Sequence, residues 1–191
     1  MLVTMVVFVL GVLQHRDDRA ARSTAVSAIA PAPVAQDGTV LVVRAIDGDT
    51  IELEGGALVR YLGIDTPETV DPRKSVQCFG PEASQANHAF VDGKRVRLVA
   101  DVEDRDQYGR MLRYVYLVDG TFVNLALAQQ GFAAAYTYPP NVAHAEDIRA
   151  AVRTARKEGR GLWASCRGVR TDRGEDAYQK QVRKNRFPST P

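Results

Sequence analysis

The fold is decided by residues 39–68, which read TVLVVRAIDGDTIELEGGALVRYLGIDTPE. The stretch contains three segments rich in apolar and β-branched residues, as strands are: Val40–Ala45, Thr50–Leu53 and Leu58–Ile64. Asp47-Gly48 marks a turn between the first two segments, and Glu54-Gly55-Gly56 marks a hairpin between the second and third. We therefore expect three short consecutive strands joined by tight turns.

Five further elements follow downstream. Two more strand segments are Lys94–Asp101, which alternates basic and apolar residues, and Leu112–Val118. Three segments have helical patterns and end signals: Pro81–Val91, Phe122–Gln130 and Ala143–Glu158. One helix after the third strand and two after the fifth indicate an α+β, mainly β fold. The expected architecture is a five-stranded OB-type Greek-key barrel with three helices.

The barrel is expected to occupy residues 39–167, with a different kind of segment on each side. Residues 1–13 form an uncharged apolar run, as long as the core of a signal peptide and too short to span a bilayer unaided. Residues 14–38 are rich in Ala, Pro and Ser, which is typical of a linker. Residues 168–191 are basic and lack apolar periodicity, so we expect a disordered tail. The apolar run predicts a secreted or envelope-anchored protein.

The charge of the expected barrel argues against binding nucleic acid by bulk electrostatics. The chain has 25 basic and 23 acidic residues; removing three of each before residue 39, and six basic and three acidic after 167, leaves 16 basic and 17 acidic. The net charge of 39–167 is therefore −1. Any contact with nucleic acid must depend on a few placed groups, with or without a bound cation.

Two carboxylates could meet at one edge of the predicted sheet. Asp49 opens one strand and Asp65 closes its neighbour, so a hairpin could bring them together. Two carboxylates with a backbone carbonyl and water suit a hard cation such as Ca²⁺. The spacing alone favours a simpler interpretation, in which Asp47-Gly48-Asp49 is only a turn and Asp65 only a strand end.

Five motifs, taken in order, resemble the thermonuclease (staphylococcal-nuclease-like) family. They are IDGDT (46–50), RYLGIDTPE (60–68), FGPEAS (79–84), DRDQYGR (104–110) and GLW (161–163). The resemblance covers about residues 40–165 and implies an OB barrel with three helices, in agreement with the pattern of elements above. It also implies a calcium-dependent hydrolase that cuts DNA and RNA with low sequence specificity.

The resemblance assigns roles to individual positions. It implies the following set: Arg60 and Arg110 on the scissile phosphate, Glu68 as general base, Asp49, Asp65 and the Thr66 carbonyl as Ca²⁺ ligands, Asp47 beside the metal, and Tyr108, Tyr136 and Tyr138 on the substrate. Guanidinium groups hold phosphate oxygens in pairs, and a carboxylate can take a proton from water. Aromatic rings stack on any base, which favours unpaired strands. A monomer is expected, and a cis bond at Pro139-Pro140 is consistent with the family.

The resemblance also bears on whether the two cysteines form a disulfide. Two cysteines in a chain are as compatible with unpaired core thiols as with a bridge. Cys78 immediately precedes FGPEAS and Cys166 closely follows GLW, and the family fold places both motifs in one compact body. Together with export to an oxidising compartment, this predicts a Cys78–Cys166 disulfide.

Two other functions compete with the nuclease. Relatives of this fold that lose active-site carboxylates or arginines serve as non-catalytic OB-fold nucleic-acid-binding modules, but all those positions are filled here. A metal-buffering or adhesive envelope protein would explain the apolar run and the acidic residues. It would leave both arginines and the tyrosines without a role.

Overall fold

The computed structural model describes residues 38–70 and 75–166. Along the chain it contains β1 (Val40–Ala45), β2 (Thr50–Leu53), β3 (Leu58–Tyr61), β4 (Gly63–Asp65), α1 (Gly80–Val91), β5 (Arg95–Val99), β6 (Met111–Leu117), α2 (Val123–Gln129), β7 (Ala134–Tyr136), α3 (Ala145–Lys157) and α4 (Leu162–Ser165). The apolar run 1–13, the linker up to residue 37 and the tail 168–191 lie outside the described residues.

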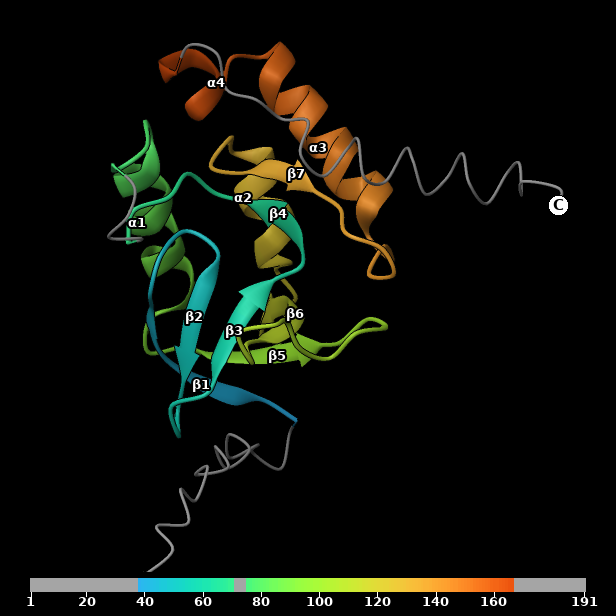
Figure 1. The fold of residues 1–191 in the computed structure, drawn as a ribbon. Coiled ribbons are helices and arrows are strands. Elements are labelled where there is room, and N and C mark those ends of the chain that lie inside the picture. The colour runs from blue at the N-terminus through green and yellow to red at the C-terminus, as the bar shows by residue number, and fades with distance from the viewer. Residues whose placement is uncertain (1–37, 71–74, 167–191) are drawn as a thin grey trace, which may run out of the picture.

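The expected barrel is confirmed (Figure 1). Its strands are hydrogen-bonded in the order β1-β2-β3-β6-β5, and β5 pairs back onto β1 to close the barrel. β3 and β6 are parallel, whereas the other neighbours are antiparallel. The side chains that fill the barrel are fully buried and come from alternate strand positions, among them Val42, Ile51, Leu53, Val59 and Val96.

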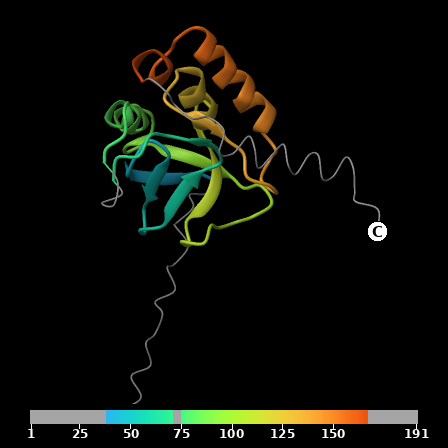
Figure 2. The ribbon, with the colours of Figure 1, turned by 45° about the horizontal axis from the view of Figure 1, so that its top comes forward.

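Helices α2 and α3 cover the same side of the barrel in both views, with β4 and β7 between α3 and the barrel strands (Figures 1 and 2). One stripe of α3 faces the core, with Ile148 and Ala155 fully buried and Val152 nearly so. The three predicted helices begin and end within two residues of the observed α1, α2 and α3. The short α4 has no counterpart in the sequence interpretation.

The third predicted strand, Leu58–Ile64, is wrong as a single element, because the chain bends at Leu62. The side-chain amide of Asn124 on α2 donates to the Leu62 carbonyl at 2.9 Å, and the Leu62 amide donates to the Arg113 carbonyl at 2.9 Å. Gly63 follows with φ +80°, a left-handed conformation that suits glycine. The bend directs β4 out of the barrel, where it pairs with β7.

The structure also places the two cysteines together. Cys78 and Cys166 form a disulfide with Sγ atoms 2.00 Å apart and Cα atoms 5.9 Å apart. The pair links the residue before Phe79, the N-cap of α1, to the C-cap of α4. It therefore connects the start of the first helix to the end of the described chain.

We predict that the purified, unreduced protein contains no free thiol. The bridge closes a loop across a sequence separation of 88 residues. By the chain-entropy model such a loop contributes at most about 4–5 kcal/mol to the free energy of unfolding. Thiol counting on denatured, unreduced protein tests the pairing, and a thermal melt with and without reductant measures its contribution. Two free thiols in protein recovered from outside the cell would contradict the bridge.

Within the described residues, no helix is both long and apolar enough to cross a membrane.

Candidate functional site

A cleft of about 1080 Å³ opens where β2, β3 and β4 meet the loop before β6. It is lined by every residue for which the sequence predicted a role in chemistry or binding: Asp47, Asp49, Arg60, Asp65, Thr66, Glu68, Tyr108, Arg110, Tyr136 and Tyr138. These residues come from five separate segments of the chain. Only the tertiary fold brings them to one surface.

The turn that carries Asp49 is fixed from both sides. The Asp47 side chain accepts a hydrogen bond from the Asp49 amide at 2.9 Å, which closes a tight local turn. Asn87 on α1 donates to the Asp47 carbonyl at 2.8 Å, and the buried Tyr61 hydroxyl donates to Asn87 at 2.9 Å. Asp49 is only 5% exposed as a result. The sequence analysis missed Asn87 and Tyr61, because nothing in the local pattern relates them to this turn.

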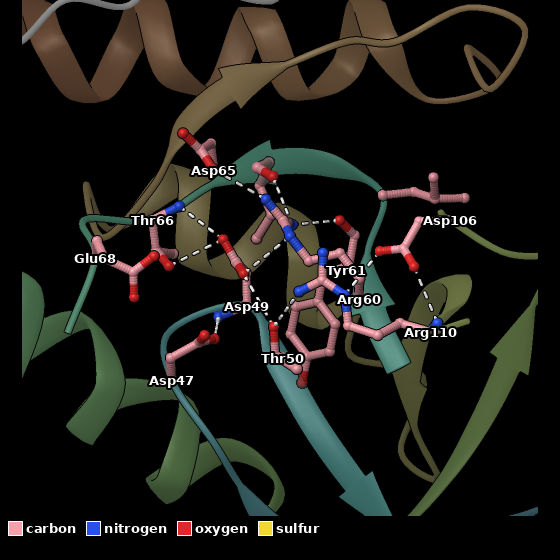
Figure 3. Close-up of polar contacts among 12 residues, drawn as sticks. Asp47, Asp49, Thr50, Arg60, Tyr61, Asp65, Thr66, Glu68, Asp106 and Arg110 are labelled. Carbon is pink, nitrogen blue, oxygen red and sulfur yellow. Dashed lines mark hydrogen bonds and ion pairs between the residues drawn. The ribbon is translucent and has the colours of Figure 1, made fainter. Parts of the chain in front are cut away.

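Asp49 and Asp65 meet around Arg60, as Figure 3 shows. The Arg60 Nε lies 3.1 Å from Asp49 Oδ1, and its Nη2 lies 3.0 Å from Asp65 Oδ1. The other Asp49 oxygen accepts hydrogen bonds from the amide and the hydroxyl of Thr66, at 2.8 and 2.9 Å. The two carboxylates therefore meet, as expected, but not through the predicted hairpin, because Asp65 lies on β4, which pairs with β7 and not with β2.

Arg60 is held rigidly in the wall of the cleft. Its Nη1 donates to the carbonyls of Tyr61 and Ile64 at 2.7 and 2.9 Å, and its side chain is 14% exposed. Burial opposes the charge, but the carboxylates of Asp49, Asp65 and Asp47 outweigh it, so the pKa of Arg60 is raised above its ordinary value. The guanidinium remains a permanent cation in a site of preorganised geometry.

Gly48 leaves room for Thr66, and we predict that Gly48→Ala disturbs the Asp49 edge. A Cβ at this position would lie 2.6 Å from the Thr66 hydroxyl oxygen. Overpacking of this kind typically costs about 1–3 kcal/mol of stability. Thermal melts of Gly48→Ala, Thr66→Gly and the double variant measure the effect, because a Cβ at 48 would also lie 2.7 Å from the Thr66 Cβ that alanine would keep. The cost of Gly48→Ala should shrink when residue 66 is already glycine; equal costs in both backgrounds would show that Thr66 is not the obstacle.

Arg110 is oriented by Asp106. Its Nε lies 2.7 Å from Asp106 Oδ2, while Asp106 Oδ1 accepts the backbone amides of Tyr108 and Arg110 at 2.9 and 3.0 Å. One carboxylate thus shapes the loop and aims the guanidinium toward the cleft. The sequence analysis quoted the motif that contains Asp106 but assigned it no role. The four-residue spacing from Asp106 to Arg110 is the signal that could have found it.

Glu68 lies on the other side of the Asp49 edge from Arg110 in Figure 3. Its Oε1 accepts the amides of Thr69 and Val70 at 3.0 and 2.9 Å. The carboxylate borders the cleft on the segment that follows Thr66 and Pro67. The cleft therefore presents a carboxylate on one side and a guanidinium on the other.

The three tyrosines lie on the rim and differ in exposure. Tyr108 is 74% and Tyr138 is 60% exposed, whereas Tyr136 is half-buried at the end of β7. The Arg110 guanidinium carbon lies 5.6 Å from the centre of the Tyr108 ring. The peptide bond between Pro139 and Pro140 is cis, as expected, in the turn between Tyr138 and Asn141. Exposed rings at the mouth of a cleft can stack on planar groups of a ligand.

The cleft carries more negative than positive charge. Six carboxylate residues line it (Asp47, Asp49, Asp65, Glu68, Glu103 and Asp106), against three arginines (Arg60, Arg105 and Arg110). Burial, and then the neighbouring Asp49 carboxylate, raise the pKa of Asp47 to about 6. Negative charge is thus concentrated around Asp47 and Asp49, where a cation would relieve it.

The donor set at this edge suits a hard cation. Among the described residues, no group of three or more His, Cys, Asp or Glu side chains is arranged to hold a metal. Asp49 and Asp65 supply carboxylate oxygens, and Thr66, the residue after Asp65, contacts Asp49 through its amide and its hydroxyl. A cation here would need the Thr66 carbonyl and water to complete its shell, which Ca²⁺ accepts and zinc does not favour.

The edge of this closed OB-type barrel carries two carboxylates around Arg60 and a second guanidinium, that of Arg110, which Asp106 aims. Guanidinium groups in fixed positions are typical of sites that bind carboxylate or phosphate. Residues 58–165 match the model of the family described as staphylococcal nuclease homologue, and the chain belongs to this family. The relatives below carry the names of nucleases.

Three relatives illustrate the similarity. The chain is 44% identical over 126 residues to the thermonuclease of Staphylococcus intermedius, covering 64% of this chain and 74% of the relative. It is 40% identical over 134 residues to the thermonuclease of Staphylococcus hyicus, covering 69% and 79%. It is 41% identical over 147 residues to the SPbeta prophage-derived endonuclease YokF of Bacillus subtilis (strain 168), covering 74% of this chain. The chain spans about half the length of YokF, 49%.

Proposed function

We propose that this protein is a calcium-dependent nuclease that hydrolyses phosphodiester bonds of DNA and RNA with low sequence specificity. The observation that carries the proposal is the single cleft that gathers Arg60, Arg110 and Glu68 beside the Asp49–Asp65 edge. Membership of the staphylococcal nuclease homologue family supports the reaction class.

The arginines are proposed to act on the scissile phosphate. Asp106 aims Arg110 through Nε and leaves its Nη groups for a phosphate. Arg60 has Nε on Asp49, Nη1 on two carbonyls and Nη2 on Asp65, so it would release a carboxylate contact before taking two phosphate oxygens. A planar guanidinium binds two phosphate oxygens in one fork. The pair would neutralise the phosphodiester and hold it at the cleft.

Glu68 is proposed to orient the attacking water and accept its proton at a carboxylate oxygen. One of its oxygens already accepts two backbone amides, which fixes the carboxylate at the border of the cleft. Because Glu68 and Arg110 border the cleft on opposite sides, a water activated by Glu68 would attack a phosphate held by Arg110 from across the cleft.

Asp49, Asp65 and the Thr66 carbonyl are proposed to hold the cation, with Asp47 beside it. When bound, Ca²⁺ would supply a positive charge that polarises the phosphate and lowers the repulsion between it and the carboxylate-rich cleft. Arg60 contacts both carboxylates, and its charge reduces the mutual repulsion of Asp49 and Asp65. The same contacts keep the edge assembled.

The substrate is proposed to be an unpaired strand. Tyr108 and Tyr138 expose most of their rings at the rim, and Tyr136 lies half-buried behind them. Stacking on such rings is indifferent to the base and requires it to be unstacked, which favours single strands. Because the stacking groups do not read base edges, cleavage would have low sequence specificity. Since none of the proposed contacts is made to the sugar 2′-hydroxyl, both DNA and RNA would be accepted.

The protein is proposed to act as a monomer outside the cytoplasm, either secreted or anchored to the envelope. The apolar run 1–13 motivates this location, and the Cys78–Cys166 pairing is consistent with an oxidising compartment.

The test is incubation of the purified protein with single-stranded DNA and with RNA, with added calcium and with a calcium chelator. Cleavage of both polymers in calcium alone supports the proposal. Tight binding of both without cleavage would instead identify a non-catalytic OB-fold binding module.

A further inference from the structure

Gln77 spans the backbone of Glu68 with two hydrogen bonds. The Glu68 amide donates to the Gln77 side-chain oxygen at 3.1 Å, and the Gln77 amide donates to the Glu68 carbonyl at 2.9 Å. The two bonds fix the peptide groups on either side of Glu68. Gln77 has no role in the nuclease mechanism proposed for this protein.

The segment that carries Gln77 is itself attached to the body of the protein. The Gly80 amide donates to the Gln77 carbonyl at 3.0 Å, where α1 begins. A Cβ on Gly80 would lie 2.6 Å from Thr69 Cγ2 and 3.1 Å from the Glu68 carbonyl oxygen. The start of α1 therefore packs directly against the backbone carbonyl of Glu68 and the side chain of Thr69, at a distance that only glycine permits.

Two further contacts hold the same segment from the other side. Cys78, the residue after Gln77, is bonded to Cys166 beyond α4. Phe79 stacks on Phe132, with ring centres 5.7 Å apart. The disulfide thus connects Cys166, at the end of the described chain, to the residue next to Gln77.

We infer that Gln77 is a positioning residue for Glu68 and that the Cys78–Cys166 disulfide holds Gln77 in place, so that reduction lowers turnover through Glu68. This inference rests on the proposed role of Glu68 as the base. A displacement of about 1 Å at a reacting group can cost on the order of 10²-fold in rate. Gln77 is exposed, so water competes for its hydrogen bonds and they contribute little to stability. Position and stability can therefore be separated by experiment.

The first experiment compares three variants with the wild type on single-stranded DNA. Gln77→Leu removes the acceptor for the Glu68 amide, Gln77→Glu keeps one, and Gln85→Leu makes the same change as the first at an exposed position of α1. We expect Gln77→Leu to lower kcat by about tenfold or more while KM, the Kd for Ca²⁺ and Tm change little. Gln77→Glu should recover most of kcat, and Gln85→Leu should match the wild type. An unchanged kcat in folded Gln77→Leu overturns the inference. An equal loss of kcat in Gln77→Leu and Gln77→Glu overturns it as well.

The second experiment tests the coupling to the disulfide. Cys78→Ser with Cys166→Ser is made in the wild type and in Gln77→Leu, and kcat is measured well below each Tm. If the disulfide acts through Gln77, its removal lowers kcat in the wild type and lowers it much less in Gln77→Leu. Equal fold-losses in both backgrounds overturn the coupling. The proposed function fails separately, when the wild type does not cleave DNA or when Glu68→Gln cleaves it normally.

Discussion

Glu68→Gln is expected to keep the fold and to lower the turnover of single-stranded DNA by at least about 10², because a neutral amide cannot take a proton from water. The substitution preserves the shape of the side chain and an oxygen that can accept the amides of Thr69 and Val70. The loss should therefore appear in kcat, with a much smaller change in KM.

The matched control is Glu54→Gln, which makes the same change at an exposed position in the hairpin between β2 and β3, away from the cleft. It should cleave like the wild type. Circular dichroism and a thermal melt check that both variants are folded. Near-normal turnover in folded Glu68→Gln would remove this residue from the mechanism and would favour another base in the cleft.

Removal of calcium should have an equally large effect. In excess chelator we expect cleavage to fall to background, and magnesium to restore it poorly, because Mg²⁺ requires tight octahedral geometry and dehydrates reluctantly. Two observations agree with a calcium shell that mixes protein oxygens and water. The Asp65 side chain is 51% exposed, and the cleft is open to water. Full activity in excess chelator would refute the requirement.

A calorimetric titration makes the same test without relying on activity. Asp49→Asn removes one negative charge from the edge while keeping an oxygen that can accept from Thr66. We expect it to raise the Kd for calcium at least about 10–100-fold, because losing a group that only supports a metal ligand already has an effect of that size. Asp119→Asn, at a fully exposed turn between β6 and α2, is the control and should bind like the wild type. Equal Kd values for the two variants would place the cation elsewhere.

The candidate site residues could be named from the sequence because the local motifs that contain them resemble those of the thermonuclease family; their spacing alone favoured a turn and a strand end. IDGDT and RYLGIDTPE hold Asp49, Arg60 and Glu68 within twenty residues, and DRDQYGR holds Arg110. The five barrel strands were equally accessible, since alternation of apolar residues is set by which face of each strand is buried. Their order around the barrel, β1-β2-β3-β6-β5, comes from the structure.

What only the tertiary structure decided is how these residues are held. The bend at Leu62 depends on Asn124, and the Asp47 turn depends on Asn87, each contributed by a helix that lies elsewhere in the chain. Gln77 is hydrogen-bonded to the Glu68 backbone because α1 and the disulfide hold Gln77 beside it. Hydrogen bonds between distant residues leave no periodic trace in the sequence, whereas burial does. The sequence by itself therefore indicated the groups that we propose carry the chemistry and the strands beside them. The packing of the helices against the barrel determined the geometry of these groups.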